Sequence, residues 1–311
     1  MSIHQFLLPS FLVAALLSSC GPHQDSAPQL SPWQTHYRAG EEALQQGDYP
    51  QAQQQYEAAR GDLADAADPR LVPTLQRLAG LQALQGRLVP ADSLYRLALS
   101  LAQHALSPLD PQHILLQTQA AAFYLDLKKY AQAESLYTQA LAQQQQLPEP
   151  RTPQLAAILD QLADLYRAQG QHSLADSLSK SAMACKFGAQ AYESYLQGNY
   201  PQAETFYRRA IAIQEKTVGD HPDLARSCRE LAMLYQARGD SPQAEAFYRR
   251  AIAIQEKTIG DHAELARTLD NYALLLRKSK RDAEAQAAED RARQIRHTDE
   301  HPTPDQSQER P

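Results

Sequence analysis

The sequence predicts an all-α protein, an α-solenoid built from about seven stacked helical hairpins. The first observation is a near-duplication. The segment PQAETFYRRAIAIQEKTVGDHPDLAR at 201–226 returns 41 residues later, at 242–267, as PQAEAFYRRAIAIQEKTIGDHAELAR, with four positions changed. A unit that recurs at a fixed period of about 20 to 50 residues stacks against its own copies.

The second observation is a pattern of alanine, tyrosine and alanine at offsets of zero, four and seven inside the duplicated segment. These offsets fall on one face of a helix. The pattern recurs along the chain, with Ser179 and Glu289 replacing tyrosine in two copies. The seven registers are Ala52/Tyr56/Ala59, Ala91/Tyr95/Ala98, Ala133/Tyr137/Ala140, Ala175/Ser179/Ala182, Ala203/Tyr207/Ala210, Ala244/Tyr248/Ala251 and Ala285/Glu289/Ala292.

The third observation is a small residue twelve positions before the first alanine of every register. Two helices of a hairpin can approach at the short end of the usual 8 to 10 Å axis separation only where side chains are small. We therefore predict that these residues lie at the contact between paired helices. They are Gly40, Ala79, Ala121, Ala163, Ala191, Ala232 and Ala273.

Turn signals separate the two helices of most units, as in Gly47-Asp48-Tyr49 and Gly198-Asn199-Tyr200. Glycine tolerates the positive φ that such a turn requires. With the small residues, these turns resemble the tetratricopeptide repeat over residues 33–296. The loop Gly219-Asp220-His221-Pro222 most resembles the kinesin light chain variety. The resemblance implies a right-handed superhelix whose first helices line a concave, protein-binding groove.

In chain order, residues 1–19 are expected to be a lipoprotein signal peptide. The apolar run from Phe6 to Leu17 is too short to span a bilayer, and Leu17-Ser18-Ser19-Cys20 resembles the bacterial lipobox. That resemblance implies lipidation of Cys20, although no lysine or arginine precedes the run. Residues 20–32 are polar and proline-rich, and we expect a flexible tether there.

Repeats one to four are expected over 33–185 and repeats five to seven over 186–296. The spacing between first alanines falls to 28 residues between Ala175 and Ala203. Either the first helix of repeat five is shortened and starts near Gly188, or two helices fuse across 184–191. The helix-weakening glycine favours the shortened helix. Residues 297–311 lack apolar side chains to bury, and we expect them to be disordered.

Four aromatic residues cluster around this irregular junction: Phe187, Tyr192, Tyr195 and Tyr200. They either line a groove between two sub-arrays or fill the space that the missing turn leaves. Nearby Cys185, together with Cys228, is expected to be a buried thiol, although a disulfide between them is the alternative in an exported protein.

Composition and motifs point away from nucleic acids and from catalysis. The chain carries 30 basic and 36 acidic side chains and lacks the clustered basic stripe of a nucleic-acid binder. It contains no phosphate-binding glycine loop, nucleophile elbow or paired zinc-type cysteines. We therefore expect no catalytic residue, cofactor, metal or small-molecule substrate.

The sequence therefore predicts a protein-binding scaffold, anchored through Cys20 in the cell envelope, at the outer membrane or periplasmic face if the cell is Gram-negative. The alternative is a cytosolic scaffold or chaperone-like adaptor without a lipid anchor. Partners would be proteins or peptides held in the C-terminal half of the groove, because aromatic, methionine and arginine side chains suit binding hot spots. The predicted contact residues are Tyr192, Tyr195, Arg229, Met233, Asp270 and Arg277.

Overall fold

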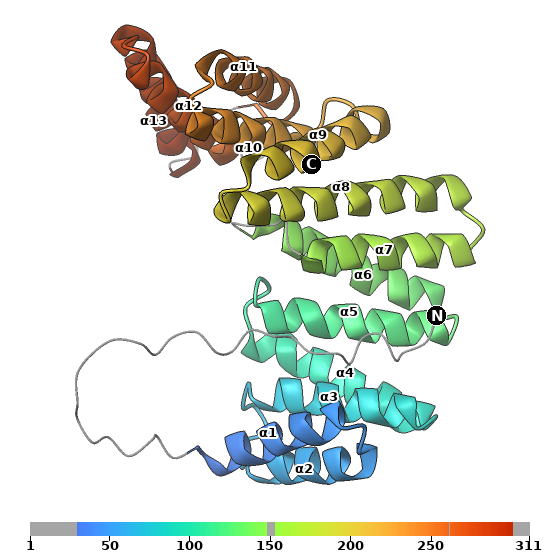
Figure 1. Cartoon of the computed structure of the whole chain (residues 1–311). Coiled ribbons are helices and arrows are strands. Elements are labelled where there is room, and N and C mark those ends of the chain that lie inside the picture. The colour runs from blue at the N-terminus through green and yellow to red at the C-terminus, as the bar shows by residue number, and fades with distance from the viewer. Residues whose placement is uncertain (1–29, 148–152, 261, 301–311) are drawn as a thin grey trace, which may run out of the picture. The chain divides into compact units, whose positions relative to one another are not determined.

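The computed structural model describes residues 30–147, 153–260 and 262–300, and every element within these ranges is an α-helix. This confirms the predicted all-α class (Figure 1). The chain divides into two compact units, Met1–Pro150 and Arg151–Pro311. The first unit contains α1 (Pro32–Gln45), α2 (Tyr49–Gly61), α3 (Leu71–Leu84), α4 (Leu88–Ala105), α5 (Pro111–Asp126) and α6 (Tyr130–Gln146). The second contains α7 (Pro153–Ala168), α8 (His172–Leu196), α9 (Tyr200–Thr217), α10 (Pro222–Arg238), α11 (Ser241–Thr258), α12 (Ala263–Lys278) and α13 (Asp282–Glu300).

Within each unit the helices pair as hairpins, and one residue with a positive φ closes each hairpin turn. At five turns this residue is glycine, as at Gly47, where φ is 75°. In the α5–α6 and α12–α13 turns it is Lys128 and Lys280, each with φ 58°. The next residue often caps the second helix, and the Asp48 side chain accepts a hydrogen bond from the Gln51 amide at 3.0 Å. The turn therefore both reverses the chain and starts the following helix.

The small residues predicted at the helix contacts are all buried, which confirms their position. The closest approach is in repeat one, where Gly40 of α1 faces the ring of Tyr56 from α2. A Cβ added to Gly40 would lie 2.7 Å from Tyr56 Cε1, closer than carbon atoms pack. A side chain larger than hydrogen at this position would push the two helices apart.

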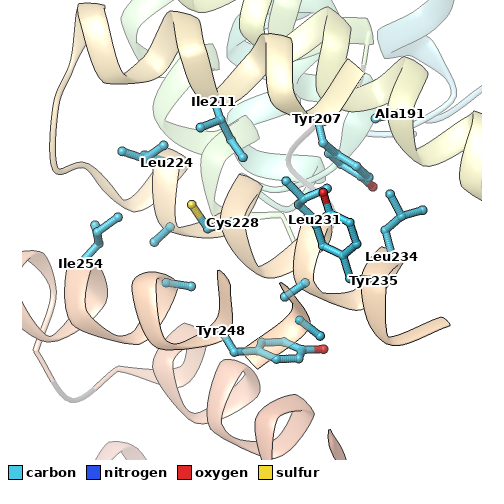
Figure 2. Packing of buried hydrophobic residues seen from close by; sticks show 14 of the residues in the cluster. Ala191, Tyr207, Ile211, Leu224, Cys228, Leu231, Leu234, Tyr235, Tyr248 and Ile254 are labelled. Atoms are coloured by element: carbon cyan, nitrogen blue, oxygen red, sulfur yellow. The ribbon is translucent and has the colours of Figure 1, made fainter. Parts of the chain in front are cut away.

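The second unit contains an apolar core cluster to which successive repeats contribute equivalent residues. Tyr207 and Tyr248 lie 41 positions apart and are 2% and 0% exposed. Both rings, together with Cys228, point into the cluster that α9, α10 and α11 enclose (Figure 2). Cys228 and Cys185 are buried free thiols, as predicted.

The irregular junction differs from the prediction, because α8 runs unbroken for 25 residues from His172 to Leu196. The helix does not restart near Gly188, and the two predicted helices are fused. It packs against both α7 and α9. A mid-helix glycine costs about 1 kcal/mol, and packing on both sides outweighs this cost. Helix α8 therefore serves as the second helix of repeat four and the first of repeat five.

The C-terminal helix is also longer than expected, because α13 continues through residues 297–300, which were predicted to be disordered. Residues 282–301 contain no proline or glycine that would end the helix earlier. The Thr298 hydroxyl donates a hydrogen bond to the Gln294 carbonyl at 3.0 Å, within the helix. Across the three described ranges, no helix is both long enough and apolar enough to cross a membrane.

Candidate protein-binding surface

The position after the small residue places apolar side chains on three successive first helices of the second unit. Tyr192 lies in the second half of α8, Met233 in α10 and Leu274 in α12, each 41 residues from the next. Equivalent positions of stacked repeats share one face. Leu196, one turn after Tyr192, extends the set. We call Tyr192, Leu196, Met233 and Leu274 the apolar row.

The apolar row is largely open to solvent. Tyr192 is 47% exposed, Leu274 58% and Leu196 65%. Met233 is half-buried, and its Sδ atom lies 3.5 Å from Nδ2 of Asn271 on α12, which links the two helices. Exposed large apolar side chains arranged in a row, rather than scattered singly, are typical of an interaction site.

Arg229 is not the exposed contact that the sequence predicted. The residue is 6% exposed, and its Nη1 atom donates to Glu264 Oε2 at 2.7 Å, which ties α10 to the start of α12. Burial acts to raise the pKa of Glu264, but the charge and hydrogen bond of Arg229, together with the charges of Arg226 and Arg267, lower the pKa overall. Arg229 therefore stabilises the contact between the first helices beneath the apolar row.

Asp270 and Arg277, the other charged residues predicted in the groove, also have partners within the chain. Asp270 Oδ2 accepts from Arg296 at 2.6 Å, and Arg277 Nη2 donates to Glu289 Oε2 at 2.7 Å. Glu289 occupies the position at which most other repeats have tyrosine. Its ion pair with Arg277 replaces the packing of a tyrosine ring at that position. Both charges are balanced within the chain, so the apolar side chains are what this surface offers to a partner.

The aromatic cluster at the junction combines the two expected arrangements. Tyr195 packs its ring 5.8 Å from Tyr200, and both rings contact the core, as does Phe206, which stacks on Phe187 at 5.9 Å. These rings fill the space beside the fused helix. Tyr192 remains exposed and belongs to the surface.

The remaining points of comparison with the sequence prediction concern Leu196, Cys20 and metal binding. Leu196 was missed, although its position one turn after Tyr192 is visible in the sequence. Cys20 lies outside the described residues. Within those residues, no group of three or more histidine, cysteine or acidic side chains could hold a metal ion.

The family model described as tetratricopeptide repeat matches residues 112–186, 191–257 and 229–296, which together are more than half of the chain. The crystal structure of BtubC (BKLC) from P. vanneervenii is 21% identical, covers 88% of this chain and 92% of its own, and has a TM-score of 0.33. A Podospora anserina putative kinesin light chain with nearly identical repeats is 22% identical over 74% of this chain and 98% of its own, with a TM-score of 0.42. A tetratricopeptide repeat protein from Parabacteroides merdae is 18% identical over 85% and 93%, with a TM-score of 0.37. No curated protein matches the sequence.

Proposed function

Because the chain belongs to the tetratricopeptide repeat family, we propose that it is a non-catalytic scaffold that binds apolar segments of other proteins on its apolar row. The observation that carries this proposal is the exposure of Tyr192 and Leu274 in equivalent registers, beside charges that are already paired. A partner that covers these side chains removes apolar surface from water. This burial contributes a favourable free energy of roughly 25 cal/mol per Å², from which the costs of association must be subtracted.

Site-specific photo-crosslinking tests this surface. A photoreactive benzoyl-phenylalanine at position 192 or 274 is expected to form adducts with partner proteins in intact cells. Val89 of α4 is the matched control position, since its side chain is 79% exposed and lies in the other unit. Adducts that form equally well from position 89 would show that the apolar row has no special affinity.

A double substitution, Tyr192→Ser with Leu274→Ser, provides the complementary loss of function. Both side chains are exposed, so the helical circular dichroism signal should not change, while partner capture falls at least tenfold. Val89→Ser serves as the control and should retain capture. Undiminished capture by the double variant would exclude the apolar row.

We further propose that Cys20 carries a lipid that anchors the scaffold in the cell envelope. The short apolar run ending in Leu17-Ser18-Ser19-Cys20 supports this, because it suits a lipoprotein signal peptide. Palmitate labelling of the wild-type chain, absent from Cys20→Ala, is the expected result. If neither the wild-type chain nor Cys20→Ala were labelled, the result would favour the alternative, a cytosolic scaffold or chaperone-like adaptor.

A further inference from the structure

Helix α8 leaves a core-type side chain uncovered on the side opposite the apolar row. Met183 lies eight residues before the small residue Ala191, the register that Leu71, Leu155, Leu224 and Leu265 occupy in other repeats. Those leucines are at most 8% exposed, whereas Met183 is 51% exposed. The difference follows from the fusion, because the preceding second helix that would cover this register is here part of α8 itself.

An arginine ladder runs along the second helices of the same unit. Arg250 Nη2 of α11 donates to Glu215 Oε1 of α9 at 2.6 Å. Forty-one residues later, Arg291 of α13 pairs in the same way with Glu256 of α11. We call each of these ion pairs a rung. In each rung the arginine lies six residues after the first alanine of its repeat, and the glutamate lies twelve residues after the first alanine of the preceding repeat.

The first rung of this ladder lacks its carboxylate. Its arginine is Arg209 of α9, and its acid position, twelve residues after Ala175, is Phe187. The Arg209 guanidinium carbon lies 5.7 Å from the centroid of the Phe187 ring, a cation–π contact in place of an ion pair. No carboxylate of the described residues lies within ion-pairing distance of Arg209, which is exposed.

These features lie together on one face. Met183 and Phe187 are one turn apart on α8, and the Phe187 ring stacks on Phe206 of α9 at 5.9 Å. Tyr192 follows Met183 by nine residues, two and a half helical turns, and so lies on the opposite side of α8. The face formed by Met183, Phe187 and Arg209 is therefore separate from the apolar row.

We propose that Met183, Phe187 and Arg209 form a second docking surface, for a protein segment that presents a carboxylate next to an aliphatic or aromatic side chain. The carboxylate completes the first rung on Arg209, as Glu215 and Glu256 do in the other rungs. The apolar neighbour covers Met183 and the exposed part of Phe187. Charge complementarity selects this partner, because the ladder provides an arginine and no described residue supplies the acid.

Selection of random twelve-residue peptides displayed on phage tests the proposal with the full chain as bait. The recovered peptides are expected to carry aspartate or glutamate beside an apolar residue. Their affinity, measured by fluorescence anisotropy, should fall at least tenfold for Phe187→Glu, which supplies the missing acid from within the chain. Arg209→Glu should instead select lysine or arginine peptides. This second variant alters an exposed side chain and keeps the test valid if Phe187→Glu folds poorly.

Two control variants show whether peptide binding is specific to this surface. Arg250→Gln breaks the second rung and should leave peptide affinity within twofold, and Tyr192→Ser should do the same because it alters only the apolar row. Acidic peptides that bind Phe187→Glu and Arg209→Glu as tightly as wild type would overturn the proposal. It would also be overturned if sedimentation showed a dimer that Phe187→Glu dissolves, because the occupant would then be a second copy of the chain.

Discussion

Replacing His113 and Gln117 together by leucine should stabilise the first unit. The two residues lie on α5, eight and four positions before the small residue, and are 5% and 3% exposed. Four other repeats carry apolar residues in these registers: Leu71/Leu75, Leu155/Leu159, Leu224/Cys228 and Leu265/Leu269. His113 Nδ1 and Gln117 Oε1 are buried without a hydrogen-bond partner among the described residues. The pair is therefore a polar interruption of an otherwise apolar core.

The size of the effect follows from these contacts. A buried polar atom without a partner costs about 1 to 3 kcal/mol, so two such atoms cost about 2 to 6 kcal/mol. The substitution also removes the single contact between the two side chains, a 3.4 Å approach of their Nε2 atoms worth about 1 kcal/mol at most. The net gain should be about 1 to 5 kcal/mol in the free energy of unfolding.

Urea unfolding followed by circular dichroism measures this gain, and hydrogen exchange of the α5 amides localises it. The reverse exchange in repeat two, Leu71→His with Leu75→Gln, is the matched control and should destabilise the same unit. A double-leucine variant that unfolds at the same or a lower urea concentration than wild type would refute the reasoning, because the two orphaned atoms would then carry no cost.

Three further predictions concern one hydrogen bond, one turn residue and one ion pair. Tyr56→Phe removes the hydroxyl that donates to Glu41 Oε1 at 2.6 Å and should cost about 1 to 3 kcal/mol in urea unfolding; an unchanged midpoint would show the bond to be neutral. Lys128→Gly should raise the free energy of unfolding, measured in urea, by up to about 1 kcal/mol, because glycine adopts a φ of 58° without strain, whereas Lys128→Ala should not. The hydrogen bond from Arg281 lowers the pKa of Glu245, so the folded state gains stability above the ordinary glutamate pKa of about 4.3 and loses it as the pH falls through the lower folded pKa. Arg281→Ala should therefore flatten the acid limb of the stability profile below about pH 5, and an identical limb would contradict this.

Much of the fold could be predicted from spacing alone, because alanine and tyrosine at fixed offsets determine which helix face is buried. The fused helix could not be predicted this way. At Gly188, local propensity favours a break by about 1 kcal/mol, but α8 packs against both α7 and α9. The turns at Lys128 and Lys280 were missed because a positive φ is normally read from glycine.

The candidate surface was predictable in part. The exposure of Tyr192 follows from its register next to a small residue. The burial of Arg229 does not, because its partner Glu264 lies 35 residues away in the next repeat. Pairing between repeats depends on which side chains meet after stacking, and the pattern within one repeat does not contain this information. The same holds for Arg209, whose missing acid is evident only when the rungs are compared.

The account depends on side-chain size at the contact between paired helices, and one comparison of two alanine substitutions tests this directly. Gly40→Ala places a Cβ 2.7 Å from the Tyr56 ring, whereas Gly61→Ala, at the end of α2, meets nothing within 4 Å. Alanine favours a helix by up to about 1 kcal/mol at either site, but overpacking costs about 1 to 3 kcal/mol at Gly40. Urea unfolding should therefore show Gly40→Ala less stable than Gly61→Ala by about 1 to 3 kcal/mol. Equal stability of the two variants would contradict the claim that small residues allow the helices to nest.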